Sequence, residues 1–325
     1  MHSDDLATSK HHNSEYLARI NRVIDYIEAH LADELVLDTL AGVANFSPYH
    51  FHRLFRALMG ETLAQYVKRV RLEKAAHQLI HNPHKNITDI AFNCGFTSSA
   101  SFARAFRDAF EVSASAWRAG EHAAYTTTKH ENSKNHQMAS KLGQTNRPPA
   151  FYSEDERRQA VQNLRTPTVD VRNIAEQHLI YVRYIGDYRG QGALFGKLFS
   201  TLSRWAGPRG LINDGTQFLS VYHGDPNITD DDKLRLEVCM TVPKDTSVSG
   251  EIGSMTLAGG RYAVGHFTLD EAQYAQAWDY IYGLWLPESG YQPDDRLSFE
   301  CYLNNPDDHP EHKHLVDIYV PVQPL

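Results

Sequence analysis

Arg53 and Arg104 are the residues of this chain with the clearest potential for specific recognition. Arg53 lies at the centre of the segment Phe-His-Arg-Leu-Phe, and Arg104 lies at the centre of Phe-Ala-Arg-Ala-Phe. In a helix, the two aromatic residues of each segment share one face that can be buried, and the arginine lies on the other side. A guanidinium in this position can donate two parallel hydrogen bonds to O6 and N7 of guanine. The two segments therefore predict two surfaces that read DNA bases.

The residues before each arginine are also repeated, over 40–56 and again over 90–107. Each copy has a short helix with an alanine (Ala41 or Ala91), a turn with Asn or Gly, and a Ser or Thr that caps a second helix. This order predicts two helix-turn-helix units, whose second helices enter DNA major grooves. The alternative is an ordinary helical bundle, which needs neither a repeated turn nor a repeated arginine.

A single helix is predicted between the copies, from Thr62 to Ile80. Its apolar face consists of Leu63, Tyr66, Val67, Val70, Leu72, Ala75, Ala76 and Leu79. Its length of roughly 28 Å approaches one DNA turn of roughly 34 Å. One chain could therefore hold two reading helices in successive major grooves.

Residues 16–118 resemble the DNA-binding domain of AraC/XylS-family transcription regulators. The resemblance rests on the Gly-Phe-Thr-Ser sequence over 95–98 and on the ending Trp117-Arg118. Two positions differ from the family pattern. Asn45 stands where the family has a glycine, although Asn tolerates the left-handed conformation. Ala114 replaces a proline and fixes the start of the last helix less firmly.

The resemblance implies base contacts from six residues of the two recognition helices: Tyr49, His52, Arg53, Ser99, Ser101 and Arg104. Five further basic residues are predicted to hold phosphates, which position a protein without reading sequence: Arg56, Lys68, Arg71, Arg107 and Arg118. For each of these five, the alternative is an ordinary solvated charge.

Charge and composition differ between the parts of the chain. The net charge is −8, but residues 14–120 hold 12 Lys+Arg against 11 Asp+Glu, and residues 166–325 hold 12 against 22. We expect modest DNA affinity with a steep salt dependence. With no membrane-length apolar stretch, no signal peptide over 1–13 and three cysteines without metal spacing, we expect a cytoplasmic protein that needs no cofactor. The resemblance to AraC/XylS-family regulators implies that the protein is bacterial and associates with the nucleoid.

The chain divides into a DNA-binding domain over 14–120, a polar linker over 121–165 and a second domain over 166–325. The linker is predicted to be a largely flexible tether, with a possible short helix over Glu154–Leu164.

The second domain is itself duplicated, with an offset of 80 residues. For example, Tyr222 aligns with Tyr302, and Trp205 aligns with Trp285. Each half reads strand, helix, strand, strand: Leu179–Ile185, Gly192–Trp205, Phe218–His223 and Leu234–Val242, then Arg261–Phe267, Ala272–Trp285, Leu297–Leu303 and His314–Pro321. These two β-α-β-β repeats predict an α+β domain with pseudo-two-fold symmetry and a cavity between its halves.

Roughly residues 168–325 resemble the GyrI-like small-molecule-binding domain, which is also found in multidrug-sensing regulators. The residues that carry the resemblance are Tyr262–Phe267, Trp285, Phe299–Asn304 and Asp317–Pro321. The resemblance implies an organic ligand between the two halves.

Glu300 is the odd residue of this repeat, because the first half has Ser220 at the equivalent position. We expect the carboxylate to lie among aromatic side chains, where it could pair with a lipophilic cation, and the resemblance implies the same role. The candidate aromatic residues are Tyr184, Trp205, Tyr222, Phe267, Trp278 and Tyr302. The alternatives are a solvated polar face for Glu300 and a core position for Trp205.

Other polar groups of this domain favour structural roles. Glu237 and Asp317 are equivalent in the two halves, and we expect them to pair with arginines or the backbone. The eighteen histidines show no HExxH or similar metal-ligand spacing, and the run from His309 to His314 falls in a turn, so no metal site is predicted.

The sequence therefore predicts a transcription regulator that binds double-stranded DNA and responds to a small-molecule effector. The resemblance adds activation and contact with RNA polymerase as expectations. Two alternatives remain open: a hydrolase that uses Glu300 as a general base beside Tyr184 or Tyr222, and a module that binds another protein.

Overall fold

The computed structural model describes residues 3–132, 164 and 167–325, which form two compact units. Among the described residues, one unit comprises 3–120 with 245–255, and the other comprises 121–132, 164, 167–244 and 256–325. None of the helices in the described part of the chain combines the length and the apolar character that a membrane span requires.

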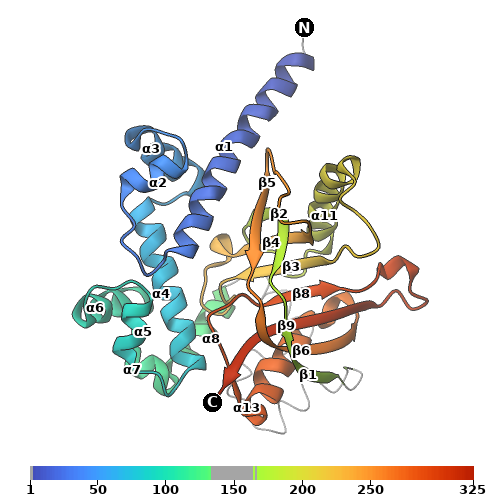
Figure 1. Cartoon of the computed structure of the whole chain (residues 1–325). Helices are drawn as coiled ribbons and strands as arrows, with labels where there is room; N and C mark the ends of the chain where they lie inside the picture. The colour runs from blue at the N-terminus through green and yellow to red at the C-terminus, as the bar shows by residue number, and fades with distance from the viewer. Residues whose placement is uncertain (1–2, 133–163, 165–166) are drawn as a thin grey trace. The chain divides into compact units, whose positions relative to one another are not determined.

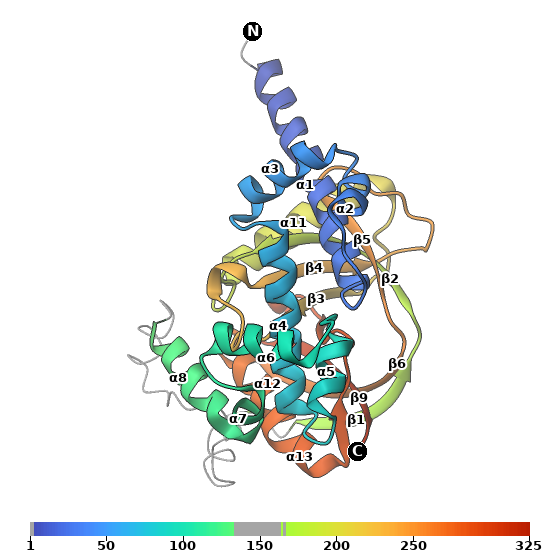
Figure 2. The same ribbon diagram turned by 90° about the vertical axis from the view of Figure 1, so that its left-hand side faces the viewer.

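Within the first unit, the elements of the N-terminal segment are all helical, and the two predicted helix-turn-helix pairs are present. Its elements are α1 (Ser3–Ala29), α2 (Leu37–Val43), α3 (Pro48–Met59), α4 (Leu63–His81), α5 (Ile87–Asn93), α6 (Ser99–Phe110), α7 (Ala114–Ala116) and η1 (Trp117–Glu121). The first pair is α2 and α3, and the second is α5 and α6. Helix α4 runs between the two pairs (Figure 2).

Helix α4 begins where the sequence predicts, because Thr62 and Gln65 form a reciprocal capping box. Most of its predicted apolar face is buried, and Val67 and Val70 are only half-buried. With 19 residues it is about 28 Å long. The rigid spacing between the two pairs is therefore set by one well-capped helix.

The two turns adopt the left-handed conformation at equivalent positions. Asn45 has a φ of 53° and Gly95 has a φ of 83°. Asn45 thus serves where the family pattern has glycine, since a short polar side chain tolerates this conformation. The second helices differ slightly at their starts, because Ser98, and not Thr97, caps α6 by accepting a hydrogen bond from the Ser101 amide.

Aromatic residues hold each pair against the rest of the unit. The predicted pairs, Phe51 with Phe55 and Phe102 with Phe106, are buried on the inner faces of α3 and α6. Trp117 packs against Phe106, and its indole N–H donates to the backbone oxygen of Ala76 in α4. The outer faces of α3 and α6 are thereby left for other contacts.

The segment expected to be a flexible linker begins with a helix, α8 (His122–Asn132). That expectation is therefore wrong for residues 122–132, where a new helix follows the non-helical Gly120, whose φ is 115°. The short helix expected over 154–164 lies outside the described residues, apart from Leu164, which is buried in the core of the second unit.

The second unit contains one antiparallel sheet covered by helices, and both predicted β-α-β-β repeats are present (Figure 1). The first is β2 (Gln177–Ile185), α11 (Gly192–Ala206), β3 (Phe218–His223) and β4 (Arg235–Thr241). The second is β6 (Gly260–Leu269), α12 (Tyr274–Asp279) with η7 (Tyr280–Trp285), β8 (Phe299–Tyr302) and β9 (His314–Pro324). Further elements are β1 (Thr168–Ile174), β5 (Ile252–Leu257), α13 (Leu286–Ser289), β7 (Tyr291–Pro293) and the short turns η4 (Gly207–Arg209), η5 (Asp231–Lys233), η6 (Glu271–Gln273) and η8 (Pro306–Asp308).

The strand order is symmetrical about the pair β3 and β8: β1-β6-β9-β8-β3-β4-β2-β5. Ser220 and Glu300, which are equivalent in the two repeats, lie directly opposite each other on these central strands. The pseudo-two-fold axis therefore passes beside Glu300. The edge strands are exchanged between the halves, because β1 precedes β2 but pairs with β6, and β5 precedes β6 but lies beside β2.

Both helices cover the sheet face to which Glu300 belongs. Directly paired residues share a face, which places Glu300 with Ser220, Tyr222 and Tyr302. Phe199 of α11 contacts the ring of Tyr302, and α12 and η7 contribute Ala277 and Ile281 to the core beside β6 and β9. Glu300 thus lies under the junction of the two halves.

Candidate nucleic-acid interface and ligand site

The outer face of α3 presents Tyr49, His52 and Arg53, all of them exposed. Arg53 is held by its neighbour one turn earlier. Its Nη1 donates to the Tyr49 hydroxyl at 2.9 Å, and its guanidinium lies 5.7 Å from the centre of the Tyr49 ring. Tyr49 is itself 66% exposed. The guanidinium is therefore oriented along the helix surface before any ligand binds.

The outer face of α6 holds its arginine less firmly than the outer face of α3 does. Ser99 and Arg104 are exposed, and Arg104 has only a long contact of 3.5 Å from Nε to the Ala100 oxygen. Ser101 is half-buried, and its hydroxyl donates to the backbone oxygen of Ser98 at 2.8 Å. Of the three residues predicted on this helix, Arg104 and Ser99 are the more available for base contacts.

Three of the five predicted phosphate contacts, Arg56, Lys68 and Arg107, are exposed. Arg71 differs, because its Nε donates to the Leu31 oxygen at 2.9 Å and its Nη2 donates to the Asp33 oxygen at 2.7 Å. It ties α4 to the turn after α1, which is a structural role. Arg118 is half-buried in η1, and burial lowers its pKa.

Glu300 is buried at the centre of the second unit, with 2% of its surface exposed. Its Oε1 accepts a hydrogen bond from the Trp278 indole at 2.7 Å. Its Oε2 accepts from the hydroxyls of Tyr222 at 2.8 Å and Tyr302 at 2.7 Å. Ser220, the equivalent residue of the first half, lies 2.9 Å from the Tyr302 hydroxyl. Both carboxylate oxygens are thus held by aromatic side chains.

Burial raises the pKa of Glu300, and the three hydrogen bonds oppose this shift. Burial and the nearby Glu300 carboxylate likewise raise the pKa of Tyr222 and of Tyr302, so both phenols remain protonated donors. The site therefore combines a desolvated acid with three fixed donors.

Further rings extend this cluster beyond the residues that the sequence singles out. Tyr188 lies 5.3 Å from the Tyr222 ring, Phe199 lies 5.5 Å from Tyr302, and Tyr282 stacks on Trp278 at 6.1 Å. Tyr188 belongs to the connection before α11, where no periodic pattern indicates its direction. Phe199 and Tyr282 could have been found from their helical spacing.

The remaining predicted ligand residues are not among the hydrogen-bond donors to Glu300. Phe267 shares its sheet face but packs in the core against Tyr280. Trp205 lies at the end of α11 with the Arg209 guanidinium 4.1 Å from its ring centre, and Trp285 stacks on Tyr291. Tyr184 of β2 lies on the same sheet face as Glu300, but β2 is two strands away from β3.

The acids expected to be structural do have partners. Glu237 pairs with Arg183 and His223, and all three are buried. Asp317 accepts from His266 at 2.6 Å and lies 3.6 Å from Arg172. His266 is also 2.7 Å from Asp170 of β1. These groups lie on the sheet face opposite Glu300 and crosslink neighbouring strands.

Comparisons with known proteins match both parts of the chain. Residues 40–120 match the helix-turn-helix domain family, and residues 167–323 match the GyrI-like small molecule binding domain family. The chain is 33% identical over 103 residues to the uncharacterized HTH-type transcriptional regulator YbfP of Bacillus subtilis, which is 32% of this chain and 35% of that protein. It is 37% identical over 107 residues to the HTH-type transcriptional activator RhaS of Enterobacter sp., which is 33% of this chain and 38% of that protein.

The chain thus spans little more than a third of the length of the curated relatives that it matches. Among solved structures, the C-terminal domain of EcmrR aligns over 50% of this chain and 100% of that chain, with 14% identity and a TM-score of 0.40. This chain therefore joins an AraC-type helix-turn-helix domain over residues 40–120 to a GyrI-like domain over residues 167–323.

Proposed function

We propose that this protein is a transcription regulator that binds an asymmetric DNA site and senses a lipophilic organic cation. The observation that carries the DNA-binding part is the pair of exposed arginines on equivalent helices, Arg53 on α3 and Arg104 on α6, with the well-capped helix α4 between the two pairs. Arg56, Lys68 and Arg107 are the phosphate contacts that this arrangement offers.

Selection of binding sites from a random DNA library tests this part. With full-length protein at fixed salt, we expect a site with two blocks about one helical turn apart. Arg53→Ala should relax the sequence of one block and Arg104→Ala that of the other, each at a cost of ~1–3 kcal/mol. The control is Lys74→Ala, which removes a charge on α4 outside both reading faces and should leave both blocks unchanged. Arg69 is unsuitable as a control because it pairs with Glu61 and Glu73. Loss of the same block in both arginine variants would contradict the proposal.

Tyr49 is proposed to act on the DNA sequence mainly through Arg53. Tyr49→Phe removes the hydroxyl that accepts from Arg53 and keeps the ring. We expect a loss of guanine selectivity in the first block by about fivefold, because one hydrogen bond is worth about 1 kcal/mol, and no change in the second block. Competition binding with single-base variants of the selected site measures this. A change confined to a base next to the guanine would show that Tyr49 reads a base itself.

For the C-terminal domain, the carrying observation is the carboxylate of Glu300 held within a cluster of aromatic rings. A lipophilic cation can neutralise this buried charge and pack against ring faces, an attraction worth roughly 0.5–2 kcal/mol per ring. To reach it, the ligand must displace at least one of the three donors. This displacement at the junction of the two halves would bias the domain between two conformations, which is the requirement for ligand-dependent regulation.

The direction of regulation is proposed to be activation through RNA polymerase, as the name of RhaS as an activator supports. A hydrolase that uses Glu300 as a base is less compatible with the geometry. Both oxygens of its carboxylate are already occupied by three donors from aromatic side chains, and Tyr184 is not among them. If the wild type turned over a bound compound and Glu300→Gln abolished this turnover, the result would favour the hydrolase.

A further inference from the structure

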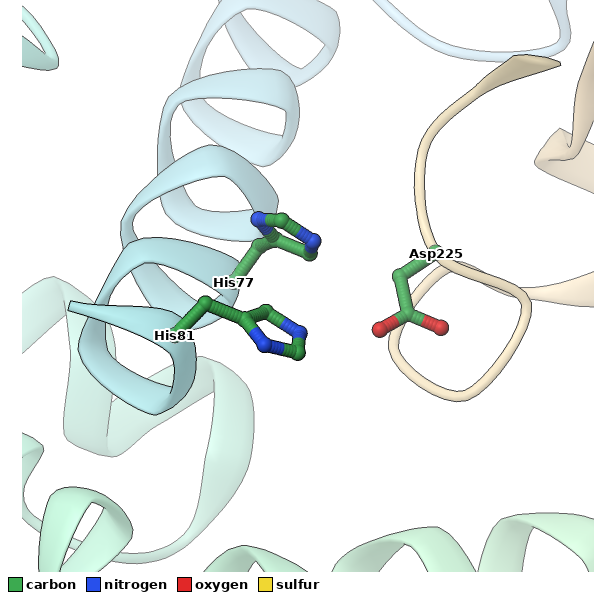
Figure 3. Close-up of side chains that lie close together, drawn as sticks. All are labelled: His77, His81 and Asp225. Carbon is green, nitrogen blue, oxygen red and sulfur yellow. The ribbon is translucent and has the colours of Figure 1, made fainter. Parts of the chain in front are cut away.

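Two histidines of α4 take no part in the DNA-reading faces or in the buried side of that helix. His77 and His81 lie one turn apart, with ring centres separated by 4.3 Å, and both are half-buried. Figure 3 shows the two rings side by side on one side of α4; Asp225, drawn in the same view, belongs to the other unit. The expectation that no histidines have metal-ligand spacing is therefore wrong, since the pattern His-x-x-x-His is present at 77–81.

The distance between these side chains fits chelation. One ring nitrogen from each histidine lies within 4.8 Å of the other. Two imidazole nitrogens on a tetrahedral zinc ion are about 3.4 Å apart, given Zn–N bonds of about 2.0–2.1 Å. Small rotations of the two rings can close this difference, because an i,i+4 pair shares one face of the helix. The backbone of α4 need not move.

We propose that His77 and His81 form a bidentate site for a divalent transition metal of the zinc or nickel class. Imidazole favours these ions over Mg²⁺ and Ca²⁺, which prefer oxygen ligands. With two ligands from one helix, the remaining positions are open to water or to other donors, so binding is reversible. The bound ion would clamp the last two turns of α4, the helix that lies between the two reading pairs. This site is independent of the proposed function.

Calorimetric titration of the full chain with ZnCl₂ at pH 7.5, in a buffer that does not bind metal, tests the site. We expect the tightest binding event to weaken by tenfold or more in His77→Gln and in His81→Gln. The matched control is His84→Gln, which changes an exposed histidine of the following loop and should leave this event unchanged. Glutamine is a good helix former, so the variants should fold.

Two further readouts complete the test. Zn²⁺ should raise the melting temperature of wild type and of the His84 variant but not of the His77→Gln/His81→Gln double variant, and MgCl₂ should have no effect on any of them. Circular dichroism in EDTA should be the same for all variants, which separates loss of metal binding from loss of folding. A tight event and a zinc-dependent melting shift that both persist in the double variant would overturn the proposal and assign the binding to other histidines.

Discussion

Replacing Glu300 by glutamine is expected to weaken the binding of lipophilic cations by about 100-fold or more. Glutamine keeps the shape of the side chain and removes its charge, so a bound cation would be left buried without a partner. Such an uncompensated charge costs about 3–5 kcal/mol, and each 1.4 kcal/mol is a factor of about ten. Binding of a quaternary ammonium compound and of its uncharged carbon isostere, measured by calorimetry, gives the comparison. The isostere should bind both proteins with similar affinity.

The pH dependence gives a second check on the same group. Burial raises the pKa of Glu300 above its ordinary value, so the carboxylate becomes protonated at a higher pH than an exposed glutamate would. Cation affinity should therefore be full at high pH and decline as the pH falls through this raised pKa. Glu271→Gln, which alters an exposed carboxylate of the same half, is the control and should retain the wild-type affinity. If Glu300→Gln bound cations as tightly as wild type at every pH, the aromatic cluster would not be a cation site.

Replacing Gly95 by alanine is expected to destabilise the N-terminal unit by about 3 kcal/mol. Its φ of 83° is unfavourable for any residue with a Cβ, at a cost of about 1–2 kcal/mol. A Cβ at this position would also lie 2.4 Å from the Leu31 oxygen and 2.7 Å from Cζ of Arg71. Relief of this clash must disturb the hydrogen bond between Arg71 and Leu31, and overpacking of this kind costs about 1–3 kcal/mol.

Gly42→Ala is the matched control, because Gly42 lies within α2 and a Cβ there would meet no atom within 4 Å. This variant should be neutral or more stable by up to about 1 kcal/mol, since alanine favours helix over glycine. Urea unfolding followed by circular dichroism at 222 nm, which is dominated by helices, measures both. Equal stability of the Gly95→Ala variant and wild type would show that the second turn is looser than the structure indicates.

The sequence predicts both repeats well because their evidence is local. Helical spacing of the aromatic pairs locates α3 and α6, and the periodic apolar face from Leu63 to Leu79 locates α4. For Glu300, the structure places three of the six aromatic candidates within hydrogen-bond distance of its carboxylate, while its role as a ligand site stays a prediction. The comparison of the two repeats located this cluster, because Glu300 stands where the first repeat has Ser220.

The features that the sequence does not reveal depend on contacts between distant segments. The exchange of β1 and β5 between the halves is a matter of which edge each strand joins, and strand periodicity carries no such information. Arg71 resembles any surface arginine until its partners, backbone oxygens 38 and 40 residues away, are known. Composition likewise favoured a linker over α8, because Thr and His have weak helix propensity. These residues are nevertheless helical in the structure.

Footprinting of the selected DNA site, combined with the protein-to-DNA stoichiometry, tests the central proposal most directly. One chain per site should protect guanines in two successive major grooves on one face of the duplex from methylation at N7 by dimethyl sulfate, because α4 lies between two reading helices of the same chain. Arg53→Ala and Arg104→Ala should each weaken protection in a different groove. Protection of a single groove by one chain, or of two grooves only when two chains are bound, would contradict the proposal that both helix-turn-helix units read DNA.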